Sequence, residues 1–326
     1  MPRILHLLTG PTAVGKTEWA LRWAEQHGAE LVSCDSLLFY RGMDIGTAKP
    51  SADELARVPH HLIDILDPAE RMTVVEYARR ARAAVEEIHS RGRAVLVVGG
   101  SGFYLRSFLA PVTDEIEVPE SLRSELEAEW TTRGLGGLVE RLVRLNPAGL
   151  GTLDVDNPRR VLRALERCLV SGRTLEELAA AFAARPAPYS DWELRLSRLD
   201  CEVTELSERI ERRTQQMLAT GLLAEVAALR ARGLELNPSA CGAIGYRECL
   251  AVLRGEGTEA DLARQIAANT RALVKKQRTW FRTQLPPHRL VPLGRATVET
   301  LFAAADPGAS TPSDNLVEDD AESRQG

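Results

Sequence analysis

Two alternating periods of apolar residues run along this chain of 326 residues. Short apolar runs at 4–8, 29–34, 62–66, 94–98 and 194–199 have the length and bulk of strands that are buried in a parallel sheet. Between them, apolar residues recur three or four positions apart, as on one face of a helix. The alternation predicts an α/β fold, a parallel sheet flanked by helices.

The first run leads into the octet GPTAVGKT, residues 10–17, which is followed by a helical pattern. The octet fits the phosphate-loop template through Gly10, Gly15, Lys16 and Thr17, and its flanks supply the strand and helix that this loop requires. The glycines allow backbone N–H groups to turn toward an anion at the start of the helix. Lys16 would contact the outer phosphates and Thr17 would hold Mg²⁺. The alternative, a glycine-rich turn with a surface lysine, is disfavoured because strand, spacing and helix agree.

The ends of two predicted strands carry further candidate chemistry. Asp35 and Ser36 follow the second strand at the sheet edge where ligands bind in open α/β sheets, although Asp35 could also only cap the next turn. The strand at 94–98 runs into Gly99, Gly100 and Ser101 instead of the acid that usually holds Mg²⁺ in phosphate-loop hydrolases. Bare amides and a small hydroxyl favour close approach of a substrate, which makes nucleotide hydrolysis less favoured.

The rest of the pattern is mostly helical. Capping boxes predict helix starts at Thr73 and Thr174, and Asn157 with Pro158 predicts another. The segment 40–50 reads as a loop over the site, 206–231 as one long helix, and 242–247 as a break with an exposed aromatic residue. We therefore predict a first part of the core at 1–118, a helical insertion at 119–190, the remainder of the core at 191–305 and a disordered acidic tail at 306–326.

Charge is distributed unevenly. The net charge is −5, but residues 306–326 contain six acids and one arginine, so the remainder is neutral. The helix predicted to end near 284 places four cations on one stripe, and no acid lies between the first and the last of them: Arg271, Lys275, Arg278 and Arg282. Its apolar stripe comprises Leu262, Ile266, Leu273 and Trp280. A stripe of this kind is either a solvated face or a polyanion site, and the lack of acids favours the second.

The chain has no apolar run of about 18 residues and no signal-peptide pattern, so we expect a cytoplasmic protein without a membrane partner. Its five cysteines lack zinc spacing and are expected to be reduced, buried thiols.

Seven segments, in order, resemble the bacterial tRNA dimethylallyltransferases, and the likeness extends over about residues 4–293. They are GPTAVGKT, CDS (34–36), YRGMDIGTAKP (40–50), VVGGSGFYL (97–105), RIERR (209–213), GYR (245–247) and KKQRTWFR (275–282). The resemblance implies transfer of a dimethylallyl group from dimethylallyl diphosphate to N6 of the adenosine 3′ of the anticodon, with Mg²⁺ as cofactor. We expect a monomer that binds the anticodon stem-loop of tRNA.

The family pattern also implies roles for single residues. The expected donor site comprises Gly10, Pro11, Thr12, Ala13, Val14, Gly15, Lys16, Thr17 and Arg213. Asp35 matches the family's base, and Ser101 stands where many members have threonine. The expected tRNA contacts are Asp35, Ser36, Leu37, Leu38, Ser101, Arg123, Arg159, Arg160, Arg163, Gly245, Tyr246, Arg247, Lys275, Lys276, Arg278, Trp280 and Arg282. Leu37 and Leu38 depart from the pattern, because many members have a polar residue in this stretch.

Three other functions remain open on these residues. A small-molecule kinase that uses ATP would share the loop and the sheet. An isopentenyltransferase that acts on free AMP would share the donor site. The third is a non-catalytic RNA-binding protein with a relic loop, against which Lys16, Thr17 and Asp35 argue.

Overall fold

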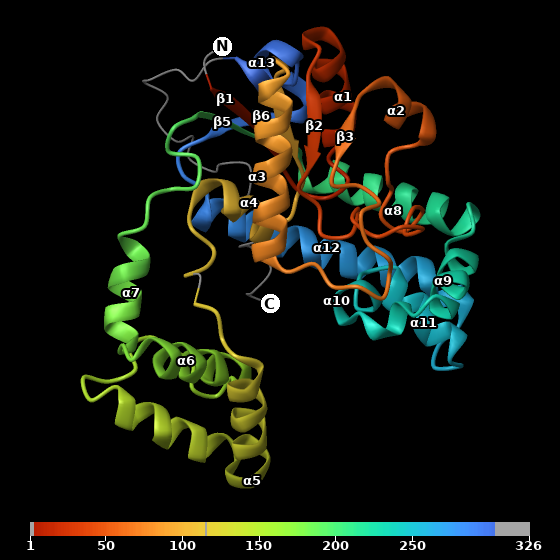
Figure 1. Cartoon of the computed structure of the whole chain (residues 1–326). Coiled ribbons are helices and arrows are strands. Elements are labelled where there is room, and N and C mark those ends of the chain that lie inside the picture. The colour runs from red at the N-terminus through yellow and green to blue at the C-terminus, as the bar shows by residue number, and fades with distance from the viewer. Residues whose placement is uncertain (1–2, 115, 304–326) are drawn as a thin grey trace, which may run out of the picture. The chain divides into compact units, whose positions relative to one another are not determined.

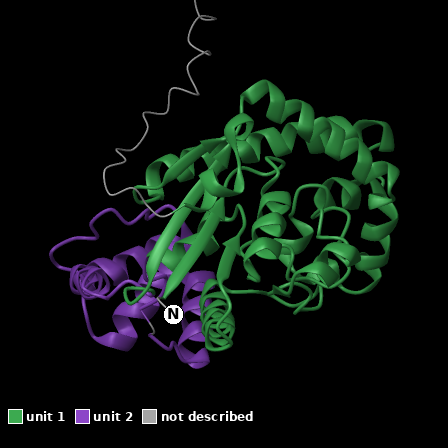
Figure 2. Cartoon of the chain, turned by 90° about the horizontal axis from the view of Figure 1, so that it is seen from above, with its two compact units in different colours: residues 1–109, 189–326 green, residues 110–188 purple. Residues whose placement is uncertain are grey.

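A sheet of six parallel strands forms the centre of the larger of two units in the computed structural model, which describes residues 3–114 and 116–303 (Figures 1 and 2). The spatial order of the strands is β3-β2-β4-β1-β5-β6. Their bounds are β1 Ile4–Thr9, β2 Glu30–Ser33, β3 His60–His61, β4 Val95–Val98, β5 Glu193–Asp200 and β6 Arg289–Pro292. The predicted α/β class with a parallel sheet is confirmed, and β1 lies between β4 and β5.

The larger unit consists of residues 1–109 and 189–326. The helices before its interruption are α1 Lys16–His27, α2 Ala52–Arg57, α3 Val74–Ser90 and α4 Gly102–Leu109. Those after it are α8 Val203–Ala219, α9 Leu222–Ala231, α10 Pro238–Cys241, α11 Tyr246–Leu253, α12 Glu259–Gln284 and α13 Val298–Phe302, with 3-10 turns at Leu234–Leu236 and Leu293–Arg295.

Helices cover both faces of the sheet, and successive side chains of a strand point to opposite faces. Leu5 and Leu7 of β1 belong to one apolar cluster with residues of α3 and α4. Leu8 of the same strand belongs to a second cluster with residues of α1 and α13. This two-sided burial explains why the strands read as continuous apolar runs.

The smaller unit, residues 110–188, contains helices and no strands within its described part (Figure 2). It contains α5 Glu120–Leu145, α6 Pro158–Ser171 and α7 Leu175–Ala183. Gly134, with φ of 66°, kinks α5. Asn157 caps α6 ahead of Pro158, and Thr174 forms a full capping box with Glu177, as the sequence predicts.

Two predicted elements are wrong. Residues 62–66 do not form the third strand, since Leu62 and Asp64 have positive φ angles of 63° and 54° and β3 lies just before them. Instead, the Ile65 N–H donates to Phe39 O at 2.8 Å in the loop after β2. The long helix predicted at 206–231 is two helices, because Gly221 takes φ of 103° between α8 and α9. Helix α2 and strand β6 were not anticipated.

Among the described residues, no helix is long and apolar enough to cross a membrane. All five cysteines are free thiols, and four are buried; Cys241 is half-buried, so its predicted burial is wrong. The tail predicted to be disordered, 306–326, lies outside the described residues.

We predict that Leu165→Ala selectively loosens the smaller unit. Leu165 is fully buried and packs in one cluster with Leu126 and Leu138. Truncating such a side chain costs about 2–5 kcal/mol, so amides of α5 and α6 should exchange hydrogen faster. The matched control is Val143→Ala, because Val143 of α5 is 48% exposed. Equal exchange in the two variants would contradict this packing.

Candidate active site

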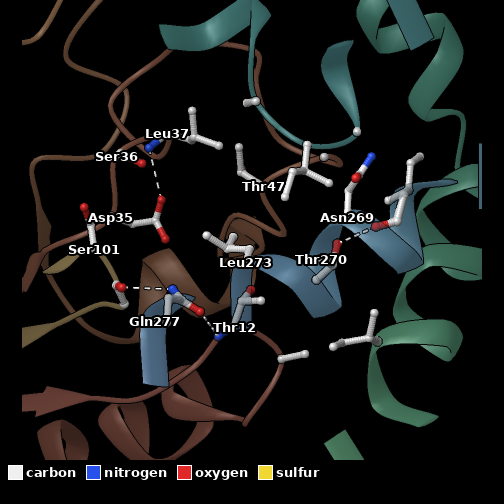
Figure 3. A pocket seen from close by; sticks show the side chains of 18 of the residues that line it. Thr12, Asp35, Ser36, Leu37, Thr47, Ser101, Asn269, Thr270, Leu273 and Gln277 are labelled. Atoms are coloured by element: carbon white, nitrogen blue, oxygen red, sulfur yellow. Dashed lines mark hydrogen bonds between the residues drawn. The ribbon is translucent and has the colours of Figure 1, made fainter. Parts of the chain in front are cut away.

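One cavity of about 550 Å³ opens at the carboxyl ends of the strands and is formed within the larger unit (Figure 3). Its walls come from the phosphate loop, the turns after β2 and β4, the loop at 46–47, helix α8, residues 242–247 and helix α12. Carboxyl ends of parallel strands meet at one edge, which is where open α/β sheets bind ligands. The fold thus gathers segments up to 265 positions apart around one space.

The phosphate loop is held tightly against the neighbouring strand. Gly10 has φ of 152°, and a Cβ there would lie 2.2 Å from the carbonyl oxygen of Leu199, so only glycine fits. Gly15, in the left-handed region, precedes the first turn of α1. Thr12, Ala13 and Lys16 line the cavity. The tight turn that the sequence predicts is therefore present at the cavity wall.

Lys16 turns its ammonium back onto the loop. Its Nζ donates to Gly10 O at 2.9 Å and to Pro11 O at 2.8 Å. Burial lowers the pKa of Lys16 to about 8, opposed by the negative charge of Asp35. An anion in the cavity would offer this ammonium a stronger acceptor than the two carbonyls.

Thr17 is exposed at the start of α1 and is not among the residues that line the cavity. Among the described residues, no group of three or more His, Cys, Asp or Glu could hold a metal ion. Mg²⁺ usually takes one or two protein oxygens together with water and substrate phosphates. The single hydroxyl of Thr17 beside the loop could serve as such a protein oxygen. It could not form a complete Mg²⁺ site without water and substrate phosphates.

Asp35 reaches the cavity from the turn after β2. Its Oδ1 accepts the N–H of Leu37 at 3.0 Å, so Asp35 caps this turn and also faces the cavity (Figure 3). Ser36 and Ser101 line the same space. Leu37 lines it too, whereas Leu38 is half-buried and is not part of the lining.

Arg213 of α8 lies across the cavity from these turns. Its guanidinium donates to Thr47 O at 3.1 Å and lines the cavity. Burial lowers the pKa of Arg213, while Asp35 raises it. Two half-buried cationic residues, Lys16 and Arg213, thus share one cavity with the carboxylate of Asp35, a charge arrangement that suits a polyanion beside a proton acceptor.

The cationic stripe of α12 is less free than its sequence indicates, because acids from other elements meet it. Arg278 donates to Asp200 Oδ1 at 2.6 Å, and its side chain is only 15% exposed. Arg271 pairs with Glu211 of α8 at 3.0 Å. Asp200 ends β5 and is thus a strand-end acid, but this ion pair occupies it. Two of the four cations on the stripe, Arg271 and Arg278, are therefore paired with acids that lie far away in the sequence.

Within 275–282 of α12 the exposed cations are Lys275, Lys276 and Arg282, and Lys276 also lines the cavity. Trp280 is half-buried: its ring packs against Gly102, where a Cβ would lie 2.4 Å from the ring. Leu273, predicted to lie on the apolar stripe, is 38% exposed and faces the cavity.

Tyr246 is buried, so its predicted exposure is wrong. Its hydroxyl donates to Glu225 Oε1 at 2.7 Å, and the same carboxylate accepts the N–H groups of Ile45 and Gly46. The tyrosine thus fixes the loop beside the cavity. Its neighbours Gly245 and Arg247 do line the cavity.

Glu248 organises that wall of the cavity, and the sequence analysis did not single it out. This buried carboxylate accepts the N–H of Gly245 at 2.6 Å, Arg247 Nε at 2.7 Å and Asn269 Nδ2 at 2.7 Å. All three donors belong to residues that line the cavity. Other lining residues that the sequence analysis passed over are Thr47, Thr214, Met217, Asn269, Thr270 and Gln277. They come from helix faces and loops without a local motif, apart from Thr47, which lies inside YRGMDIGTAKP, and Gln277, which lies inside KKQRTWFR.

The smaller unit brings two of its candidate arginines together. Arg123 of α5 and Arg163 of α6 both approach Glu166, at 3.9 Å and 2.9 Å. Arg160 pairs with Asp154 at 3.3 Å, and Arg159 is exposed. All are surface pairs, which contribute little to stability and leave the guanidinium groups accessible.

The parallel sheet and the glycine-rich cradle define a phosphate-loop α/β protein. A model of the IPP transferase family matches residues 38–284, and the chain belongs to this family. A tRNA dimethylallyltransferase of Opitutus terrae is 61% identical over 287 residues, which are 88% of this chain and 92% of that protein. One of Geobacter sulfurreducens is 39% identical over 278 residues, which are 85% of this chain and 88% of that protein.

Solved structures agree on the fold. The full-length tRNA isopentenylpyrophosphate transferase of Bacillus halodurans matches with a TM-score of 0.65 and 36% identity, covering 89% of this chain and 90% of that chain. A eukaryotic dimethylallyltransferase acting on tRNA matches with a TM-score of 0.78, covering 90% of this chain and 74% of that chain. At 23% identity, this second likeness shows the fold alone.

Diphosphate binding should weaken as pH rises through the pKa of Lys16. With a pKa of about 8, the ammonium is charged in about nine-tenths of molecules at pH 7 and about one-tenth at pH 9. A bound anion favours the charged form, so binding takes up a proton above pH 8 and Kd should rise by up to about tenfold per pH unit. Calorimetric titration with inorganic diphosphate at pH 7–9 measures this.

The control is Lys16→Arg, which keeps its charge over this range and should show little dependence on pH. The same slope in both proteins would mean that another group titrates.

Proposed function

We propose that this protein transfers a dimethylallyl group from dimethylallyl diphosphate to N6 of the adenosine 3′ of the anticodon in tRNA, with release of diphosphate. The observation that carries the proposal is that Lys16, Arg213 and Asp35 line one cavity. The first two suit a diphosphate and the third suits an amine that must lose a proton. The names of the relatives support the reaction class.

The donor's diphosphate would lie against the loop of residues 10–17, where Lys16 exchanges its loop carbonyls for phosphate oxygens. Arg213 adds a planar guanidinium suited to two phosphate oxygens. We propose that Thr17 contributes one oxygen to Mg²⁺, which when bound neutralises charge on the departing diphosphate. Because diphosphate is the leaving group, no acid is needed to activate water, in keeping with the Gly-Gly-Ser end of β4.

On the acceptor base, the exocyclic amine of adenine would donate a hydrogen bond to Asp35. The N6 lone pair forms a bond to C1 of the dimethylallyl group while the C1–O bond to diphosphate breaks. The proton of N6 passes to the Asp35 carboxylate. Ser101, labelled beside Asp35 in Figure 3, supplies a hydroxyl that would orient the base.

The acceptor base must leave its stack to enter a cavity, as in other enzymes that act on bases. We propose that the exposed cations of α12 hold the RNA backbone, together with Arg123, Arg159, Arg160 and Arg163 of the smaller unit. Gly245 and Arg247 line the cavity and would contact the incoming nucleotide. We further propose that the protein acts as a monomer in the cytoplasm.

A comparison of acceptors tests the proposal against its rivals. The protein is incubated with dimethylallyl diphosphate and either unmodified anticodon stem-loop RNA or AMP, and release of diphosphate is followed. We expect turnover when the RNA is the acceptor and no turnover when AMP is the acceptor. Turnover with AMP would indicate a free-nucleotide isopentenyltransferase. In a parallel incubation with ATP, consumption of ATP without prenyl transfer would indicate a kinase.

Asp35→Asn should lower kcat by about 10²-fold or more, the usual contribution of a positioned general base. The amide keeps the shape of the side chain and loses its basicity, so binding of donor and RNA should change much less. Single-turnover kinetics at saturating donor and RNA measures the step directly. A rate like that of the wild type would remove Asp35 from the mechanism.

Reversing Lys275 and Lys276 to Glu should weaken RNA binding and flatten its dependence on salt. Each cation that meets a phosphate releases a counterion, so the slope of log K against log salt should fall by about one per lost contact. Arg278 is left intact because it holds Asp200. The readout is RNA affinity at several salt concentrations.

The control reverses Arg79 and Arg57, which belong neither to α12 nor to the lining of the cavity and whose side chains are 67% and 52% exposed, for the same change in charge. If the control flattens the slope equally, overall charge and not α12 governs binding.

A further inference from the structure

The side chain of Gln277 connects α12 to two walls of the cavity. Its Oε1 accepts the N–H of Thr12 at 3.0 Å, and its Nε2 donates to Gly100 O at 2.9 Å (Figure 3). Thr12 belongs to the phosphate loop after β1, and Gly100 follows β4. Both ends of one amide are thus used, and each bond joins segments that are far apart in the sequence.

The bridge depends on close approach at Gly100. A Cβ at this position would lie 2.9 Å from Gln277 Nε2, 3.0 Å from Gly10 O and 3.5 Å from Lys16 Nζ. The amide of Gln277 therefore lies in one packed group with the loop carbonyl that now accepts the Lys16 ammonium. A shift of α12 at this point cannot leave the loop unchanged while both bonds are kept.

The same stretch of α12 carries the cations proposed to hold RNA. Lys275 and Lys276 directly precede Gln277, both are exposed, and Lys276 lines the cavity. One turn of helix thus carries both the lysines proposed to contact RNA and the side chain that bridges to the phosphate loop. RNA that fixes this turn also fixes the position of the Thr12 amide and, through it, the start of the loop.

We propose that Gln277 is a positioning residue that couples the two substrate sites, so that bound RNA tightens donor binding and bound donor tightens RNA binding. The inference rests on the proposed function of this cavity and adds to it a route of communication. By thermodynamic linkage, both affinities must change by the same factor. Gln277 itself needs to touch neither the reacting carbon nor the acceptor base.

The test measures the Kd of a non-reactive thio analogue of dimethylallyl diphosphate with and without unmodified anticodon stem-loop RNA. For the wild type we expect RNA to lower this Kd by about fivefold or more, the usual lower range of allosteric coupling. In Gln277→Leu, which removes both hydrogen bonds, the ratio of the two Kd values should fall to within about twofold of one. RNA affinity without donor should stay within about twofold of wild type, since the lysines are untouched.

Gln284→Leu is the matched control, because Gln284 is exposed at the end of α12 and bonds only to its neighbour Thr283 among the described contacts. It should keep the wild-type ratio. Gln277→Asn, one methylene shorter, is a second variant with the same expected loss if the leucine variant does not fold.

Two results would overturn the inference while leaving the proposed function intact. One is a wild-type protein that binds both ligands with a ratio of one. The other is a Gln277 variant that keeps the wild-type ratio. A wild-type protein that binds the donor analogue and no RNA would instead contradict the proposed function, and the inference with it.

Discussion

The ammonium of Lys16, buried at the carboxyl edge of the sheet, is the charge around which the cavity is arranged. Burial lowers its pKa to about 8, and only two loop carbonyls and more distant acids compensate it. The tight path at Gly10 holds those carbonyls in place, since Leu199 O leaves no room for a side chain. A buried cation with such modest partners favours a ligand that brings negative charge. The diphosphate of the proposed donor would meet this requirement.

Two carboxylates, Glu225 and Glu248, hold other parts of the cavity wall in place. Glu225 gathers Tyr246 and the backbone N–H groups of Ile45 and Gly46. Glu248 gathers Gly245, Arg247 and Asn269. Glu248 is buried and Glu225 half-buried, and each accepts hydrogen bonds from several donors, so each can hold neighbouring segments in a single arrangement. The cavity is therefore largely preformed, which lowers the entropy cost of binding.

The sequence predicts the class of the fold and the centre of the site because both follow local rules. Apolar runs mark β1, β2, β4 and β5. The octet after β1 and Asp35 after β2 both follow strands of one parallel sheet, which predicts that Lys16 and Asp35 lie at the same sheet edge. Long-range partners are what the sequence could not show. Arg278 reads as a free cation until Asp200, 78 positions away, is brought against it. Tyr246 reads as exposed until Glu225 accepts its hydroxyl. The strand expected at 62–66 fails because its backbone bonds to the loop after β2.

In the proposed reaction, the cavity alkylates an adenine amine of tRNA with diphosphate as the leaving group. Its most direct test is to incubate the protein with dimethylallyl diphosphate and unmodified tRNA, digest the RNA and identify the modified nucleoside and its position by mass spectrometry. We expect N6-dimethylallyladenosine directly 3′ of the anticodon and one diphosphate released for each modification. A prenyl group at another atom or position, or unmodified tRNA after diphosphate is released, would contradict it.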